Sequence, residues 1–148
     1  LHKAIRRQRQ MCIRDREIFW NHLKRGLYDQ GVDGWWMDAT EPSFRDGFTQ
    51  LKQAEKTKSA GNTYIGSFHR YLNVYSLELL RFLHDKLRTE NDEKRVFILT
   101  RSAFASQQRY ATAVWSGDVS ASWENFRKQI AAGINLSMSG IPYWTSDI

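Results

Sequence analysis

The chain has 148 residues and a formal net charge of +6, with 41% hydrophobic and 26% charged residues, two prolines and one cysteine. This composition excludes a disordered, collagen-like or disulfide-stabilised chain, so we expect a globular protein. No apolar run approaches the about 20 residues that cross a bilayer, and residues 1–16 are too basic for a signal peptide.

The positive charge is concentrated in residues 1–16, where six basic residues stand against one acidic residue. An arginine-rich arm could bind nucleic-acid phosphates, but weak periodicity favours a basic tail, and we predict no nucleic-acid partner. A non-native origin is a further alternative, because the segment resembles translated read-through at the end of a metagenomic assembly. The only cysteine, Cys12, lies here, so cysteine usage leaves the compartment open. A periplasmic or secreted location is compatible with a longer protein.

Residues 17–148 are expected to form the folded part of the chain, and the first predicted element is an amphipathic helix from Glu17 that stops at Gly31. A strand over 32–37 follows, and this run with two tryptophans is typical of a buried strand and not of an alternating, half-exposed one. It ends at Asp38. Residues 43–66 are polar and predict a long surface loop.

A long helix and a second strand follow the loop. Apolar residues recur at intervals of three and four from Tyr71 to Leu87, which predicts a helix that packs against a sheet and closes near 88–91. Residues 95–100 predict a second buried strand, and it ends at Arg101.

A third strand over 111–115 leads to Asp118, and a fourth over 141–145 leads to Asp147. A helix is expected between them, with one apolar face and a cap at each end. Its cap and face residues are Ser120 or Ser122, Trp123, Phe126, Ile130, Ile134, Met138 and Gly140.

Strands that alternate with helices predict an α/β fold with a parallel sheet. A doubly wound nucleotide-binding sheet is disfavoured because Asp-Ala-Thr-Glu-Pro, and not a glycine-rich loop, follows the first strand. A polar or charged residue follows every predicted strand. These residues would gather on the carboxyl-terminal face of the sheet, where the active sites of barrel enzymes lie. Since four strands cannot close a barrel of eight, we expect a fragment of a TIM barrel.

Asp38 and Asp118 are the candidate catalytic pair, because two carboxylates in one pocket can divide acid and base work. The structural alternative is that such aspartates cap helices or bind loop amides. Glu41 is interpreted as a first-turn or loop residue.

Four tryptophans, Trp35, Trp36, Trp115 and Trp144, lie within a few residues of the strand-end carboxylates. Indole faces suit the C–H faces of sugar rings, while core packing is the alternative for each tryptophan. Alternation places only one of Trp35 and Trp36 towards a pocket.

Metal and serine chemistry are not supported by the sequence. The four histidines lack HxxxH and HxH spacing, so we predict no metal and no cofactor. Ser116 lacks the GxSxG elbow of a serine hydrolase.

Residues 31–42, Gly-Val-Asp-Gly-Trp-Trp-Met-Asp-Ala-Thr-Glu-Pro, resemble the nucleophile segment of glycoside hydrolase family 31. Further segments fall in that family's order and spacing: 95–104, 108–110, 115–118 and 139–148. The resemblance covers about 16–148, is greatest to the α-xylosidase and α-glucosidase branch, and implies barrel strands four to seven.

The resemblance implies a retaining α-glycosidase that is α-xylosidase-like and acts on oligosaccharides or glycosides. Asp38 would be the nucleophile and Asp118 the general acid/base, while the implied substrate-binding residues are Trp36, Arg101, Trp115 and Asp147. Arg101 could bind a sugar hydroxyl or only pair with neighbouring carboxylates. An α-glucosidase and an inactive sugar-binding fragment are the alternatives, homo-oligomerisation stays open, and the chain alone is expected to be inactive.

Overall fold

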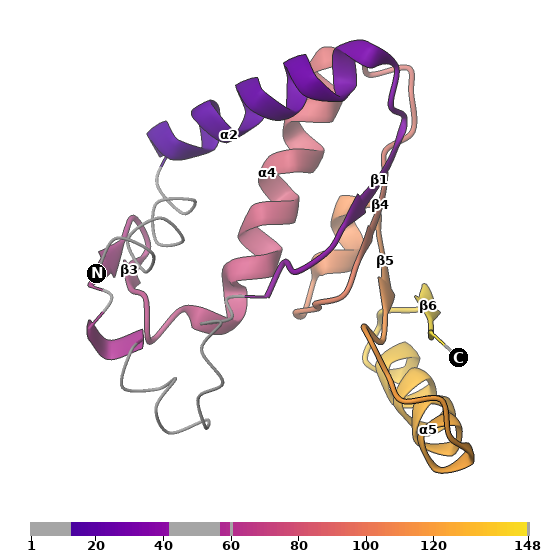
Figure 1. The fold of residues 1–148 in the computed structure, drawn as a ribbon. Helices are drawn as coiled ribbons and strands as arrows, with labels where there is room; N and C mark the ends of the chain where they lie inside the picture. The colour runs from indigo at the N-terminus through magenta and orange to yellow at the C-terminus, as the bar shows by residue number, and fades with distance from the viewer. Residues whose placement is uncertain (1–12, 42–56, 60, 148) are drawn as a thin grey trace.

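The computed structural model describes residues 13–41, 57–59 and 61–147. Its main sheet has four strands that are all parallel and whose spatial order is β1-β4-β5-β6, so neighbours in the sheet follow one another along the chain (Figure 1). This order is typical of a barrel and confirms the predicted α/β fold. The strands are shorter than predicted: β1 (Gly34–Met37), β4 (Phe97–Thr100), β5 (Thr112–Trp115) and β6 (Trp144–Thr145).

The register of the sheet aligns the carboxyl ends of the strands. Met37 lies opposite Thr100, and Thr100 lies opposite Val114. Trp115 lies opposite Thr145 on the last strand. Residues that directly follow each strand therefore meet at one edge of the sheet.

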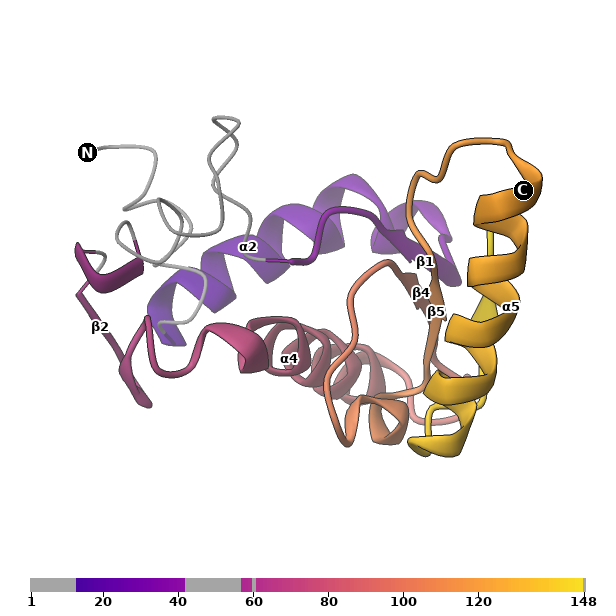
Figure 2. The same ribbon diagram turned by 90° about the horizontal axis from the view of Figure 1, so that it is seen from below.

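Helices α2 and α4 lie on the same side of β1 and β4, whereas α5 lies beside β6 (Figures 1 and 2). Within the described residues, no helix is long and apolar enough to cross a membrane. The helical elements of the described residues include α2 (Ile13–Gly26), η1 (Tyr28–Gln30), η2 (Leu72–Val74), α4 (Tyr75–Glu90), η3 (Gln107–Tyr110) and α5 (Trp123–Met138).

The largest apolar cluster fills the space between helices α2 and α4 and strands β1 and β4. Trp35 of β1 is 4% exposed and belongs to this core, whereas its neighbour Trp36 is 71% exposed. The predicted division of the two tryptophans is thereby confirmed. The buried members of the cluster are Trp20, Trp35, Leu80, Phe82, Leu83, Leu87 and Ile98.

Helix α2 begins at Ile13, four residues before the predicted start at Glu17. Arg16 is buried, and its Nη2 lies 3.3 Å from Oε2 of Glu78 on α4. Its guanidinium also lies over the ring of Tyr64, 4.7 Å from the ring centroid. The sequence places Arg16 in a solvated tail because the tertiary partners of a charged residue cannot be read from local charge. Residues 1–12 of the predicted tail lie outside the described residues.

The predicted loop over 43–66 is wrong in its last part, where a two-stranded antiparallel hairpin forms from β2 (Asn62–Thr63) and β3 (Gly66–Ser67). The Thr63 hydroxyl donates to the Gly66 carbonyl at 2.8 Å and closes the turn. Phe68, which follows the hairpin, is 1% exposed. Residues 42–56 and 60 lie outside the described residues.

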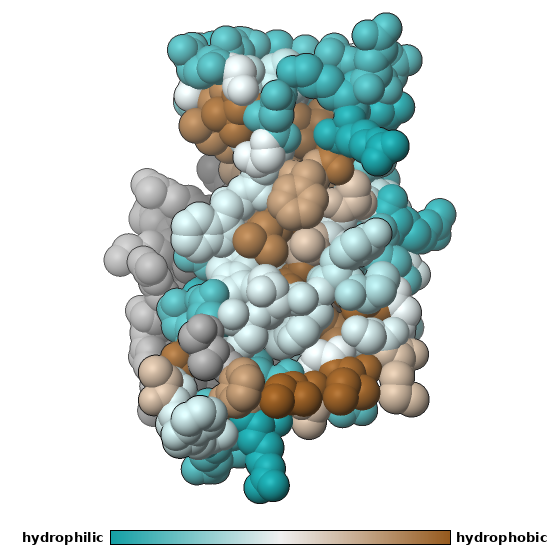
Figure 3. All heavy atoms as spheres, turned by 90° about the vertical axis from the view of Figure 1, so that its right-hand side faces the viewer, coloured by the Kyte–Doolittle hydropathy of each residue, from teal (hydrophilic) through white to brown (hydrophobic). Residues whose placement is uncertain are grey.

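Of the two predicted N-caps of α5, Ser120 and Ser122, the structure has Ser122, whose hydroxyl accepts a hydrogen bond from the Asn125 amide at 3.2 Å. The predicted apolar residues of α5 are exposed, and Figure 3 shows hydrophobic side chains at the surface on this side of the molecule. Gly133 is buried against the Trp144 ring of β6. The absence of a side chain at Gly133 allows α5 to lie close to β6.

Candidate active site

Asp38, Arg101 and Asp118 meet at the carboxyl edge of the sheet, as their positions after β1, β4 and β5 predict. Nε of Arg101 lies 3.1 Å from Oδ1 of Asp38, and Nη1 lies 3.7 Å from Oδ2 of Asp118. One guanidinium therefore stands next to both predicted catalytic carboxylates. The structure brings these three residues together because parallel strands end at a common edge.

Glu41 is a third carboxylate at the same guanidinium. Nη2 of Arg101 donates to Oε1 of Glu41 at 2.7 Å, and Nε donates to both carboxylate oxygens at 3.2 Å. Hydrogen bonding to Glu41 raises the pKa of Arg101; burial opposes this rise, and the charges of Glu41, Asp38 and Asp118 add to it. Arg101 is therefore a permanent cation in the centre of the site.

The contact of Glu41 with this guanidinium is not apparent from the sequence, which predicts a first-turn or loop residue at this position. The sequence shows only that Glu41 lies three residues after Asp38. Its contact with Arg101 depends on the path of the turn after β1. That path includes a left-handed backbone at Ala39, with a φ of 54°. Without glycine at that position, the sequence carries no signal for such a turn.

The turn after β1 is held by a cluster of hydroxyl groups. Thr40 is completely buried, and its hydroxyl is hydrogen-bonded to the hydroxyl of Thr100 and, at 2.5 Å, to that of Ser102. The amide of Ala39 donates to Oδ1 of Asp38 at 2.7 Å. A left-handed non-glycine residue costs about 1–3 kcal/mol, which these hydrogen bonds offset. The same cluster ties the loop of Asp38 to the loop of Arg101.

Asp118 follows Gly117, which has a left-handed φ of 72°. A Cβ atom at Gly117 would lie 3.4 Å from Cδ of Arg101, so glycine allows the turn to pass close to the arginine. The Asp118 side chain is 97% exposed and that of Asp38 is 56% exposed. Both carboxylates are thus open to a molecule that approaches from solvent.

Trp36 and Trp115 form an aromatic pair beside the carboxylates. Their ring centroids are 5.8 Å apart and their planes are inclined by 65°, which is an edge-on contact. Trp115 is 4% exposed, so Trp36 presents the open indole surface and Trp115 supports it. Of the two predicted sugar-contacting tryptophans, Trp36 is the one with a solvent-accessible face.

Asp147, the last predicted site residue, lies after β6. Its backbone amide donates to the Ser116 hydroxyl at 3.2 Å, which ties the end of β6 to the end of β5. Among the ion pairs of the described residues, none joins Asp147 to Arg101. Asp147 therefore stands at the same edge of the sheet but outside the charge cluster.

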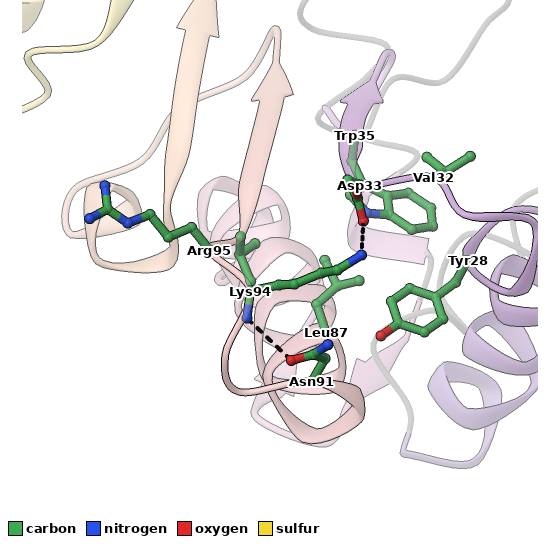
Figure 4. Close-up of a pocket in the computed structure, with 9 residues that line it drawn as sticks. Tyr28, Val32, Asp33, Trp35, Leu87, Asn91, Lys94 and Arg95 are labelled. Carbon is green, nitrogen blue, oxygen red and sulfur yellow. Dashed lines mark hydrogen bonds and ion pairs between the residues drawn. The ribbon is translucent and has the colours of Figure 1, made fainter.

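The opposite end of the strands carries a different hollow, of about 20 Å³ (Figure 4). Nζ of Lys94 lies 2.7 Å from Oδ1 of Asp33 at its wall, and Trp35 closes it towards the core. None of the predicted site residues lines this hollow. Within the described part of the chain, no group of three or more His, Cys, Asp or Glu is arranged to hold a metal ion.

A parallel sheet with acidic residues gathered at its carboxyl edge places the chain in the class of (β/α) barrel proteins with paired carboxylates. A sequence model described as the glycosyl hydrolases family 31 TIM-barrel domain matches residues 13–148. The chain belongs to glycoside hydrolase family 31 and represents part of its barrel domain.

Two curated relatives illustrate the range within the family. The chain is 45% identical to an α-xylosidase of Saccharolobus solfataricus over 132 residues, which cover 89% of this chain and 17% of the relative. It is 30% identical to an α-glucosidase of the same organism over 152 residues, which cover 90% of this chain and 22% of the relative. The chain therefore spans less than a quarter of either protein.

Solved structures give the same picture. The structure of a family 31 α-xylosidase from Xanthomonas citri matches with a TM-score of 0.79 and 39% identity, over 88% of this chain and 14% of that one. A family 31 dextranase from Flavobacterium johnsoniae, complexed with glucose, matches with a TM-score of 0.74 and 29% identity, over 88% of this chain and 16% of that one. Both matches place the four strands in a TIM-barrel domain.

Proposed function

We propose that the protein containing this chain is a retaining α-glycosidase, α-xylosidase-like, that removes terminal α-linked sugars from oligosaccharides. The observation that carries the proposal is the position of Arg101, 3.1 Å from Asp38 and 3.7 Å from Asp118 at the carboxyl edge of the sheet. Family membership and the likeness to family 31 glycosidases support it. On this proposal, the chain supplies both catalytic carboxylates of a longer enzyme.

In the proposed reaction, Asp38 attacks the anomeric carbon and forms a glycosyl-enzyme while Asp118 donates its proton to the departing glycosidic oxygen. Asp118 then takes a proton from water, the water oxygen attacks the anomeric carbon, and the bond to Asp38 breaks. Two inversions keep the α configuration. This mechanism requires the two carboxyl groups to be about 5–5.5 Å apart in the working enzyme.

Arg101 contributes charge and orientation to this reaction. Its pairing with Glu41 leaves Nη1 directed to Asp118 and Nε shared with Asp38. A fixed guanidinium limits the rotation of the attacking carboxylate and can donate to a sugar hydroxyl. The exposed face of Trp36 is suited to the C–H face of the sugar, and Asp147 can accept from one of its hydroxyls.

The choice between xylose and glucose rests on the relatives. Identity of 45% to an α-xylosidase and of 39% to a second one favours an α-xyloside, which lacks the C6 hydroxymethyl group of glucose. The second candidate is an α-glucosidase, favoured by the 30% identity to an α-glucosidase. The third, an inactive sugar-binding fragment, is disfavoured because both candidate carboxylates are present.

The test uses the full-length protein with and without Asp38→Ala, and measures hydrolysis of nitrophenyl α-xyloside, α-glucoside and α-galactoside. We expect activity on the α-xyloside that falls roughly 10,000-fold or more in the variant. Asp33→Ala is the matched control, because Asp33 is an exposed aspartate at the opposite end of β1. A well-folded protein with no activity on all three glycosides, or an active Asp38→Ala variant, would contradict the proposal.

A further inference from the structure

Gln107 is a completely buried polar residue behind the candidate active site, and the proposed reaction does not use it. It lies at the start of η3, with 0% of its surface exposed. Its Nε2 donates to the carbonyl of Ser102 at 2.7 Å, and its Oε1 accepts from the Ser76 hydroxyl at 3.2 Å. The side chain therefore connects helix α4 with the residue that follows Arg101.

Ser102 is the point where this connection reaches the catalytic loops. Its carbonyl is held by Gln107, and its hydroxyl is hydrogen-bonded to Thr40 at 2.5 Å. Thr40 lies between Asp38 and Glu41, the carboxylates that flank Arg101. A continuous set of hydrogen bonds thus runs from α4 through Gln107 and Ser102 to the turn after β1.

The backbone around Gln107 adopts conformations that need such support. Ser106 and Ala111, on either side of η3, have left-handed φ values of 77° and 55°. Non-glycine residues keep these conformations only where their surroundings impose them. The Gln107 carbonyl accepts from the Thr112 hydroxyl at 3.0 Å, and its amide donates to the Phe104 carbonyl at 3.1 Å. Main chain and side chain of Gln107 therefore both fix this segment.

We propose that Gln107 is a positioning residue that sets the direction of Arg101 between the carboxylates by holding the Ser102 carbonyl. An amide suits this place because it donates and accepts at once, whereas an apolar group would make neither the hydrogen bond to the Ser102 carbonyl nor the one from the buried Ser76 hydroxyl. The catalytic part of this inference rests on the proposed glycosidase function. Its structural part, the direction of Arg101, does not.

The test compares Gln107→Leu with Ser76→Ala in the full-length enzyme. Gln107→Leu removes the bond to Ser102, and we expect kcat to fall on the order of 10- to 100-fold with a much smaller change in KM. Ser76→Ala keeps that bond and removes only the attachment to α4, so it should lower the unfolding temperature with a clearly smaller loss of kcat. Equal losses of kcat in the two variants, or an undiminished kcat in Gln107→Leu, would overturn the inference.

Gln107→Glu is the second variant if Gln107→Leu does not fold, because it preserves shape and the acceptor for Ser76. Its ionised carboxylate cannot donate to the Ser102 carbonyl, whereas its protonated carboxyl group can, so the loss of kcat relative to the wild type should be larger at high pH than at low pH. Crystal structures of the variants give a readout that is independent of activity. We expect Arg101 to leave its position 2.7 Å from Glu41, and an unmoved arginine would overturn the inference. An inactive wild-type enzyme would refute the proposed function, while these structures would still decide the role of Gln107.

Discussion

Arg101 and Glu41 form a bidentate ion pair that joins the loop after β4 to the loop after β1. Nη2 and Nε of Arg101 both donate to Oε1 of Glu41, at 2.7 and 3.2 Å, and Nε also reaches Oε2 at 3.2 Å. This pairing leaves Nη1 on the side of Asp118. The direction of the guanidinium, and not its charge alone, therefore depends on Glu41.

Glu41→Gln in the full-length enzyme tests this dependence. The amide has no charge and only one acceptor oxygen, so the guanidinium is expected to turn towards Asp38 and weaken its attack. We expect kcat on an aryl α-xyloside to fall on the order of 10- to 100-fold, measured in steady state. Glu124→Gln, which removes an exposed partner of Lys128 on α5, should leave kcat unchanged. If both variants kept the wild-type kcat, the pairing would have no role in the reaction.

Removal of the exposed indole tests the proposed sugar contact. Trp36→Ala should raise KM for an aryl α-xyloside about 3- to 10-fold, because it removes the exposed apolar indole face against which the C–H face of the sugar would pack. Trp123→Ala, which removes another exposed tryptophan on α5, is the control and should not change KM. An unchanged KM in Trp36→Ala would place the sugar elsewhere.

The ion pairs of Glu78 predict a stability that declines in acid. Burial raises the pKa of Glu78, but hydrogen bonds from Arg81 and Tyr64 and the charges of Arg81 and Arg16 outweigh it and leave the pKa below 4.5. The ionised form thus stabilises the fold above the ordinary carboxyl pKa, and this contribution is lost as the pH falls through the lowered value.

Glu78→Gln should therefore lower the free energy of unfolding by about 1–3 kcal/mol near neutral pH, and the loss should shrink in acid. Denaturant titrations of both proteins at about pH 7 and about pH 3 measure the difference. Glu93→Gln, in the exposed turn after α4, is the matched control. A difference that is the same at both pH values would show that ionisation of Glu78 is irrelevant to stability.

Gly133 of α5 is expected to resist substitution although alanine favours helices. A Cβ atom there would collide with the Trp144 ring, so Gly133→Ala must push α5 away from β6. We expect a loss of about 1–3 kcal/mol in the free energy of unfolding. Gly26→Ala, at the end of α2 with no neighbouring atom within 4 Å, should be tolerated. A neutral Gly133→Ala would mean that helix and strand can separate without cost.

The sequence predicts the parts of this molecule that follow from periodicity. Apolar runs identify the strands, and a parallel sheet requires Asp38, Arg101 and Asp118 to share one edge. Alternation also predicts that only one of Trp35 and Trp36 is buried, and in the structure this residue is Trp35. These features depend on patterns that are local to each element.

Features that depend on turn geometry or on residues distant in the chain cannot be predicted from such local patterns. Glu41 and Gln107 reach their partners through turns in which Ala39 and Ser106 are left-handed without being glycine. Arg16 is buried because Glu78, which is 62 positions away in the chain, receives its hydrogen bond. No local pattern marks any of these contacts, and they become visible only when the elements are assembled.

The role of Asp38 as the nucleophile is tested most directly by identifying the residue that carries the sugar during turnover. The full-length enzyme is treated with a fluorinated α-xylosyl fluoride, which forms the glycosyl-enzyme faster than water releases it, and its peptides are analysed by mass spectrometry. We expect one sugar on the peptide that contains Asp38, with the label located on that aspartate. A label on another residue, or none while the enzyme hydrolyses its substrate, would contradict the assignment of Asp38 as the nucleophile.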